Sequence, residues 1–131
     1  MPSSPPTGTP VVPIPGLATF TSDGSVIETD GSEFAINPAS TTPVSTVGTP
    51  GHGIWEPGNT PISLYVQYFS LVLDPNGALY ARNITTMVLS LNTTGNQFSG
   101  TYVTDQVIGT ETKILSSGAV TGQLIPHSPL P

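Results

Sequence analysis

Alternating apolar and polar residues, interrupted by short glycine turns, run along most of the chain. Segment 16–31 holds two β-type runs on either side of Asp23-Gly24, a dipeptide typical of tight hairpins. If that turn holds two residues, Phe20 pairs with Ile27 on one face of the hairpin. No stretch shows apolar residues at helical spacing without proline or glycine, so the pattern predicts no helix.

Three further turns divide the C-terminal part into long strands. The turns at 74–77, 93–96 and 109–110 separate β-rich runs at 62–74, 78–92, 97–108 and 111–125. The run 62–74 is apolar on both faces, which predicts cover on both sides, by a core and by a neighbouring chain or loop. Gly100, Gly118 and Gly122 fall inside strands, where glycine permits the sharp bending of a small closed barrel.

The remaining segment, 32–50, holds three prolines and predicts a short strand near 33–36 followed by a long loop, often a lid or binding loop. Together with the strands of the first hairpin and the four long strands, this short strand brings the total to seven or eight strands. The predicted fold is all-β, a single antiparallel up-and-down β-barrel of about eight strands. We divide the chain into a flexible Pro/Ser-rich segment 1–15, a β-barrel domain 16–125 and a Pro-rich tail 126–131.

Composition restricts the partners of this single domain. The 131 residues include two Lys plus Arg against eight Asp plus Glu, so the formal net charge is −6. Phosphate backbones need several basic contacts, which makes nucleic acid and anionic membrane surfaces poor partners. The chain has no cysteine, which excludes disulfides and thiolate chemistry. No apolar run is long enough to cross a bilayer, so no membrane insertion is expected.

The polar residues also bear on localisation. Ser, Thr, Asn and Gln outnumber Lys and Glu, a balance common in extracellular proteins. We expect an extracellular or periplasmic protein whose signal peptide was removed and replaced by Met1 for expression. The alternative is a cytoplasmic protein with a loose N-terminal tail. Triplets at Asn83 and Asn92 match N-glycosylation acceptors, although such triplets also arise by chance in a threonine-rich chain.

The antiparallel meander and the element Gly53-Ile54-Trp55 resemble the calycin group, the lipocalin-like small β-barrels. The LATFTSDGSVIETD hairpin and the PGHGIW stretch before a long apolar strand are similar to short bacterial barrel proteins across 16–125. Allene-oxide-cyclase-like barrels have the same general look. The resemblance implies a lipocalin-like barrel with an apolar interior for a small ligand, and an arginine packed over the Trp55 ring. Arg82 is the candidate for that arginine, since the chain has no other.

The candidate catalytic residues are His52 and Glu56. Glycines on both sides of His52 free the backbone, so that its imidazole can project into a barrel mouth as a general base. The alternative is a turn residue whose ring bonds to nearby backbone. Strand alternation turns Glu56 outward if Trp55 faces inward, and it places His52 and Trp55 on opposite faces unless Gly53 forms a bulge.

The candidate ligand-binding residues are five aromatic side chains and one arginine: Trp55, Tyr65, Tyr68, Phe69, Arg82 and Tyr102. Trp55 is expected to fill the core or to floor a pocket. The face that carries Arg82, Tyr80 and Ile84 resembles a core face. The guanidinium then needs a partner, which can be the Trp55 ring, a carboxylate such as Asp105, or a ligand carboxylate. A side chain that snorkels to the rim is an equal alternative.

Three functions are compatible with these residues. The first is binding of an apolar or aromatic small molecule in the barrel interior. The second is a cofactor-free cyclase or isomerase with His52, Glu56 or a tyrosine as the acid–base group. The third is a structural module, a homo-oligomer that buries its apolar strand faces against partners. The sequence lacks metal-ligand spacing, a phosphate loop and a nucleophile elbow, so no metal and no cofactor is predicted.

Overall fold

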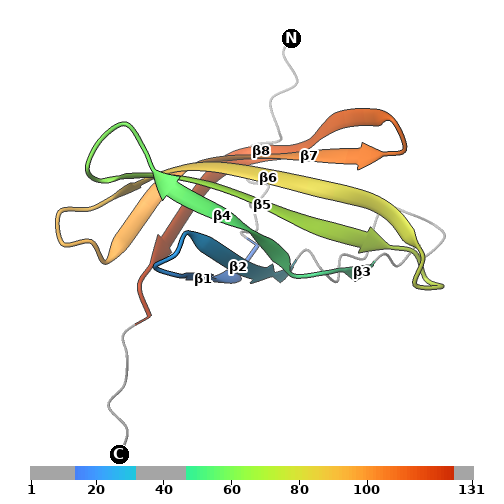
Figure 1. Cartoon of the computed structure of the whole chain (residues 1–131), viewed down its shortest axis with the longest axis horizontal. Coiled ribbons are helices and arrows are strands. Elements are labelled where there is room, and N and C mark those ends of the chain that lie inside the picture. The colour runs from blue at the N-terminus through green and yellow to red at the C-terminus, as the bar shows by residue number, and fades with distance from the viewer. Residues whose placement is uncertain (1–13, 32–46, 126–131) are drawn as a thin grey trace, which may run out of the picture.

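The computed structural model describes residues 14–31 and 47–125. This part of the chain forms one antiparallel sheet that curls into a half-barrel, with no helix, which confirms the all-β, up-and-down fold class (Figure 1). The strands are β1 (Gly16–Phe20), β2 (Ser25–Asp30), β3 (Val47–Gly48), β4 (Gly51–Pro57), β5 (Ser63–Leu73), β6 (Leu79–Leu91), β7 (Gln97–Ile108) and β8 (Glu111–Gln123). The described residues contain no helix that is long and apolar enough to cross a bilayer.

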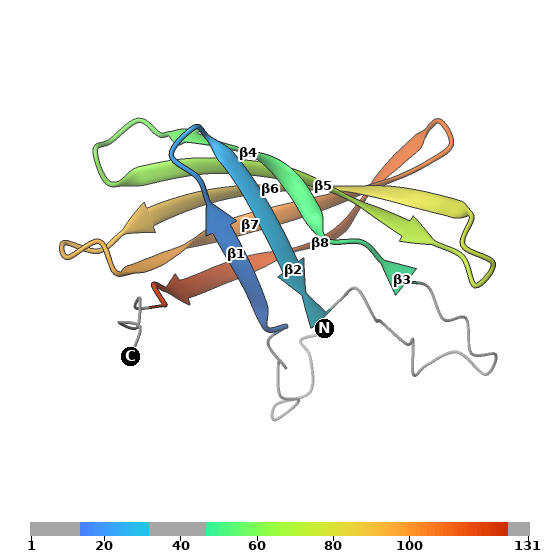
Figure 2. The same cartoon turned by 60° about the horizontal axis from the view of Figure 1, so that its bottom comes forward.

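The strands follow one another across the sheet almost in sequence order. The order is β1-β2-β4-β5-β6-β7-β8, and the short β3 pairs with the end of β5. In the described part of the chain, no pairing joins the edge strands β1 and β8. Figure 2 shows the blue β1–β2 hairpin crossing in front of the long strands. The sheet therefore has an inner face, on the side covered by this hairpin, and an outer face.

Segment 32–50 is described only in part. The strand predicted near 33–36 lies outside the described residues, as do 1–13 and the tail 126–131. The loop was predicted to continue to residue 50. This was wrong for its last part, because Val47–Gly48 forms strand β3, which pairs with β5. The backbone N–H of Leu71 also donates to the Thr49 hydroxyl over 2.9 Å. Pro50 does not prevent this pairing because it follows the strand.

The first hairpin differs by one residue from the register expected for a two-residue turn. Phe20 pairs with Val26 instead of Ile27. Gly24 has a φ of 94°, and its N–H donates to the carbonyl of Thr21 over 3.2 Å. This is a type I turn followed by a left-handed glycine, which places three residues in the loop. The longer loop brings Phe20 and Val26 to the same inner face.

The hydrophobic core lies on the inner face, between β2 and the long strands β5 and β6. Val26, Val66 and Leu89 are at most 2% exposed, and Tyr68 is 7% exposed. A ring of half-buried side chains packs around these four residues: Trp55, Leu64, Met87, Phe98 and Val120. The core is therefore filled by the protein's own side chains.

Glycines determine how closely the strands approach one another. A Cβ at Gly100 would lie 1.9 Å from the carbonyl oxygen of Val88, and one at Gly53 would lie 2.0 Å from the carbonyl oxygen of Gln67. Only glycine fits at such distances. At Gly122 the space above the backbone is taken by the ring of Phe98, 2.2 Å from the position of a Cβ.

Candidate functional site

The predicted site residues divide between the two faces of the sheet. Trp55, Tyr68 and Tyr102 lie on the inner face, whereas His52, Glu56, Tyr65, Phe69 and Arg82 lie on the outer face. Successive side chains of a strand point to opposite faces, so the two groups do not share a site. The structure brings together only part of the predicted set.

Trp55 packs against the hydrophobic core and ties it to the first hairpin. Its indole Nε1 donates to the carbonyl of Thr21 over 2.8 Å. Its ring meets the Phe20 ring edge-on, with centroids 6.5 Å apart and an angle of 79°. The expected stacking of Arg82 on Trp55 was wrong, because the two residues lie on opposite faces of the sheet.

His52 and Glu56 are exposed on the outer face of β4. His52 stands in register between Ile27 and Phe69 within β4, so it neither projects into a barrel mouth nor lies in a turn, the two alternatives that the sequence left open. The expected alternation was correct, because Trp55 faces inward while His52 and Glu56 face outward. Within the described residues, no side-chain hydrogen bond links this histidine to a carboxylate.

Arg82 is also exposed, and the prediction that its face forms the core was wrong. Its neighbours on that face, Tyr80 and Val88, are 51% and 54% exposed. The inner face of β6 holds the buried residues instead, among them Ala81 and Leu89. Sequence reasoning chose the wrong face because both faces of this strand carry apolar residues.

A row of polar side chains crosses the inner face next to the core. Tyr68, Thr85 and Thr104 are aligned across β5, β6 and β7, and the two threonine hydroxyls lie 2.8 Å apart. Burial raises the pKa of Tyr68, and the negative charge of Glu28 raises it further, whereas a hydrogen bond with Thr85 opposes the shift. Sequence reasoning missed the threonines, because only strand register brings them to Tyr68.

The raised pKa of Tyr68 predicts a pH dependence of stability. Because the fold favours the neutral phenol, this contribution is complete below the ordinary tyrosine pKa of about 10 and is lost as the pH rises towards the folded pKa. The free energy of unfolding of the wild type should therefore fall relative to that of Tyr68→Phe between pH 9 and 11. Urea unfolding across this range measures the difference, with Tyr65→Phe on the same strand as the control. A constant difference between wild type and Tyr68→Phe would contradict the prediction.

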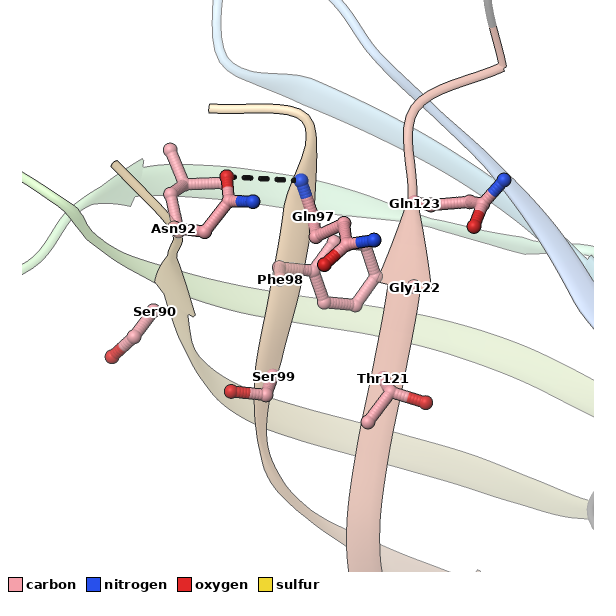
Figure 3. A pocket seen from close by; sticks show the side chains of 9 residues that line it. Ser90, Asn92, Gln97, Phe98, Ser99, Thr121, Gly122 and Gln123 are labelled. Carbon is pink, nitrogen blue, oxygen red and sulfur yellow. Dashed lines mark hydrogen bonds between the residues drawn. The ribbon is translucent and has the colours of Figure 1, made fainter. Parts of the chain in front are cut away.

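A hollow of about 470 Å³ lies where β6, β7 and β8 come together near the β6–β7 turn. Its lining consists of Ser90, Leu91, Asn92, Gln97, Phe98, Ser99, Thr121, Gly122 and Gln123. Figure 3 shows the Phe98 ring extending from β7 towards Gly122. Gln97 and Gln123 pair across the two strands one residue away, so their side chains point to the opposite face of the sheet from this ring. Sequence reasoning missed these residues, because amides and hydroxyls at strand ends look like ordinary surface.

The chemistry of this hollow is neutral. Its lining has hydroxyl groups, amide groups and one aromatic ring, and no ionisable side chain. Asn92 is occupied in its own turn, where its side-chain oxygen accepts from the backbone N–H groups of Asn96 and Gln97. In the described part of the chain, the side-chain amides of Gln97 and Gln123 make no hydrogen bond, so their donors and acceptors point to solvent or a ligand.

No group of three or more His, Asp or Glu side chains that could hold a metal ion occurs among residues 14–31 and 47–125. Comparison with protein-family models, curated proteins and solved structures found no match. Function is therefore argued from the site alone.

Proposed function

We propose that this protein binds a small, uncharged molecule that carries hydroxyl or carbonyl groups. The ligand lies in the hollow at the β6–β7 turn end of the sheet. The observation that carries the proposal is a cluster of polar side chains that strand alternation turns to one face: the hydroxyls of Ser90, Ser99 and Thr121 and the unengaged amides of Gln97 and Gln123. A volume of about 470 Å³ falls in the range of small-molecule sites.

The rim of the half-barrel is favoured over its interior because the interior is filled. Val26, Val66 and Leu89 leave no more than 2% of their surface exposed. Phe98 completes this packing from β7, and its ring lies over Gly122 on the inner face. The polar side chains of the hollow point to the opposite face of the sheet.

The lining also indicates the polarity of the ligand. Glutamine amides offer both donors and acceptors, and the hydroxyls of Ser90, Ser99 and Thr121 offer more of both. Such a set matches hydroxyl and carbonyl groups. An anionic or cationic ligand would find no countercharge in the lining. The acid–base alternative has no comparable support, because His52 and Glu56 lie on the outer face.

Isothermal titration calorimetry against a panel of neutral alcohols, amides and ketones tests the proposal. We expect saturable one-to-one binding, weakened about tenfold or more in the double variant Gln97→Ala/Gln123→Ala, which corresponds to about 1.4 kcal/mol. Asn76→Ala, in the turn at the opposite end of β6, is the control for loss of an exposed amide. Absence of binding across the panel, or unchanged affinity in the double variant, would refute the proposal.

A further inference from the structure

The outer face of the sheet exposes a set of large apolar side chains. Ile27, Ile54, Phe69, Leu71, Val103 and Ile114, here called the outer patch, are each 39–70% exposed. One row across six strands aligns Ile27, His52, Phe69, Ile84, Asp105 and Ile114 and holds three members of the patch. The patch therefore extends from β2 at one side to β8 at the other, with His52 and Asp105 between its apolar members.

In the half of the sheet that carries most of this patch, the inner face is polar and the outer face is apolar, the opposite of the arrangement around the core. There the inner face holds polar side chains, with Thr85 bonded to Thr104 and the Gln106 amide donating to Asn83 over 3.3 Å. The outer face of the same two strands holds Ile84 and Val103. An apolar sheet face is normally buried against another layer. The described residues supply that layer on the inner face only.

We propose that a second copy of this chain covers the outer patch, in a two-fold dimer that pairs Arg82 of each copy with Asp105 of the other. Two opposite charges lie within the patch, because Arg82 on β6 and Asp105 on β7 are diagonal neighbours on the outer face. No ion pair joins them in the described part of the chain. In a two-fold contact the same surface of both copies meets, so Arg82 of each copy can face Asp105 of the other and two ion pairs can form.

Charge and area both favour a second copy as the occupant. The chain has a net charge of −6, so two copies repel unless the contacting surfaces are locally balanced. Of the charged side chains beside the outer patch, Arg82 and Asp105 balance each other, and Glu56 next to Ile54 adds one negative charge. The exposed part of its six apolar residues amounts to roughly 500 Å², in the upper part of the range for the largest apolar patch of a monomer, which is often functional. With its polar surroundings the patch approaches the roughly 800 Å² that each partner contributes to a standard interface.

Charge reversal tests this arrangement. Analytical ultracentrifugation of the wild type should show a dimer. Arg82→Asp and Asp105→Arg should each raise the dimer dissociation constant at least tenfold, because each places like charges together twice. The double variant Arg82→Asp/Asp105→Arg should restore dimerisation to near the wild-type value. Lys113→Asp is the control, since it changes the net charge as much as Arg82→Asp does but lies in register with Gln106 on the inner face.

The possible outcomes separate cleanly. A monomeric wild type at high micromolar concentration would overturn the proposal and leave the outer patch to a different protein. A dimer that tolerates both single reversals, or that the double reversal fails to restore, would overturn the Arg82–Asp105 pairing. All three substituted positions are exposed or half-exposed, and circular dichroism checks that each variant folds. Ligand binding in the hollow is measured separately, so either proposal can fail without the other.

Discussion

Replacing Gly100 by alanine is expected to destabilise the protein by about 3 kcal/mol, the upper end of the usual cost of overpacking and a large fraction of the stability of a typical domain. Gly100 pairs with Leu89 at the centre of the sheet. A Cβ there would lie 1.9 Å from the carbonyl oxygen of Val88 and 3.0 Å from the Cα of Leu89. Both are backbone atoms of a strand held by hydrogen bonds, so they cannot rotate aside as a side chain does.

Gly118→Ala is the matched control for this substitution. Gly118 lies on the neighbouring strand, and a Cβ there would meet the Tyr102 ring at 3.4 Å, an ordinary contact. Both substitutions remove the same conformational freedom from the unfolded chain. Urea unfolding should therefore show a near-neutral effect for Gly118→Ala and a large loss for Gly100→Ala. Equal effects at the two positions would show that strand approach at Gly100 is not as close as described.

The second large effect is expected for Leu89→Ala, which should lower the free energy of unfolding by about 2–5 kcal/mol. Leu89 is 1% exposed and belongs to the four-residue core with Val26, Val66 and Tyr68. Its removal leaves a cavity in a core that has few members to collapse into the space. The loss should therefore lie in the upper half of this range.

Leu79→Ala, on the same strand, is the control for Leu89→Ala, because it makes the same truncation at an exposed position. Leu79 is 65% exposed, so the same truncation should cost well under 1 kcal/mol. Chemical denaturation of both variants gives the comparison directly. If Leu79→Ala were as destabilising as Leu89→Ala, the outer surface near the β5–β6 turn would have to be covered, as it would be in an assembly.

The proposed ligand site and the proposed dimer contact lie on different parts of the molecule, because the sheet is curled into a half-barrel. Curling the sheet closes the core around Leu89 and Phe98 on the inner face, while the polar side chains of the hollow lie at the β6–β7 turn end of the sheet. The same curl turns Phe69 and Val103 outward, where only another molecule can cover them. A dimer through the outer patch would leave the β6–β7 turn end accessible to a ligand.

Much of the strand plan could be predicted from the sequence, because strands and turns depend on local chemistry. Four long strands, the turns between them and the absence of a helix in the described residues followed from alternation and from glycine positions. The opposite faces of His52 and Trp55 followed from parity alone. The exception among the turns was the first hairpin. Its loop holds three residues, the last of which is Gly24, so Phe20 pairs with Val26 and not with Ile27.

Which face of each strand lies inside was decided only by the tertiary structure. Strand β5 carries Val66 and Tyr68 on one side and Phe69 and Leu71 on the other. Both faces are therefore apolar, and the alternation of side chains along the strand does not show which face is buried. The curl of the sheet selects one of them, and this selection placed Arg82 outside although its neighbours are apolar. The hollow at Phe98 likewise depends on three strand ends meeting in space. Local pattern determined the strands of this protein, whereas long-range packing determined its faces and its candidate site, because only packing brings distant residues together.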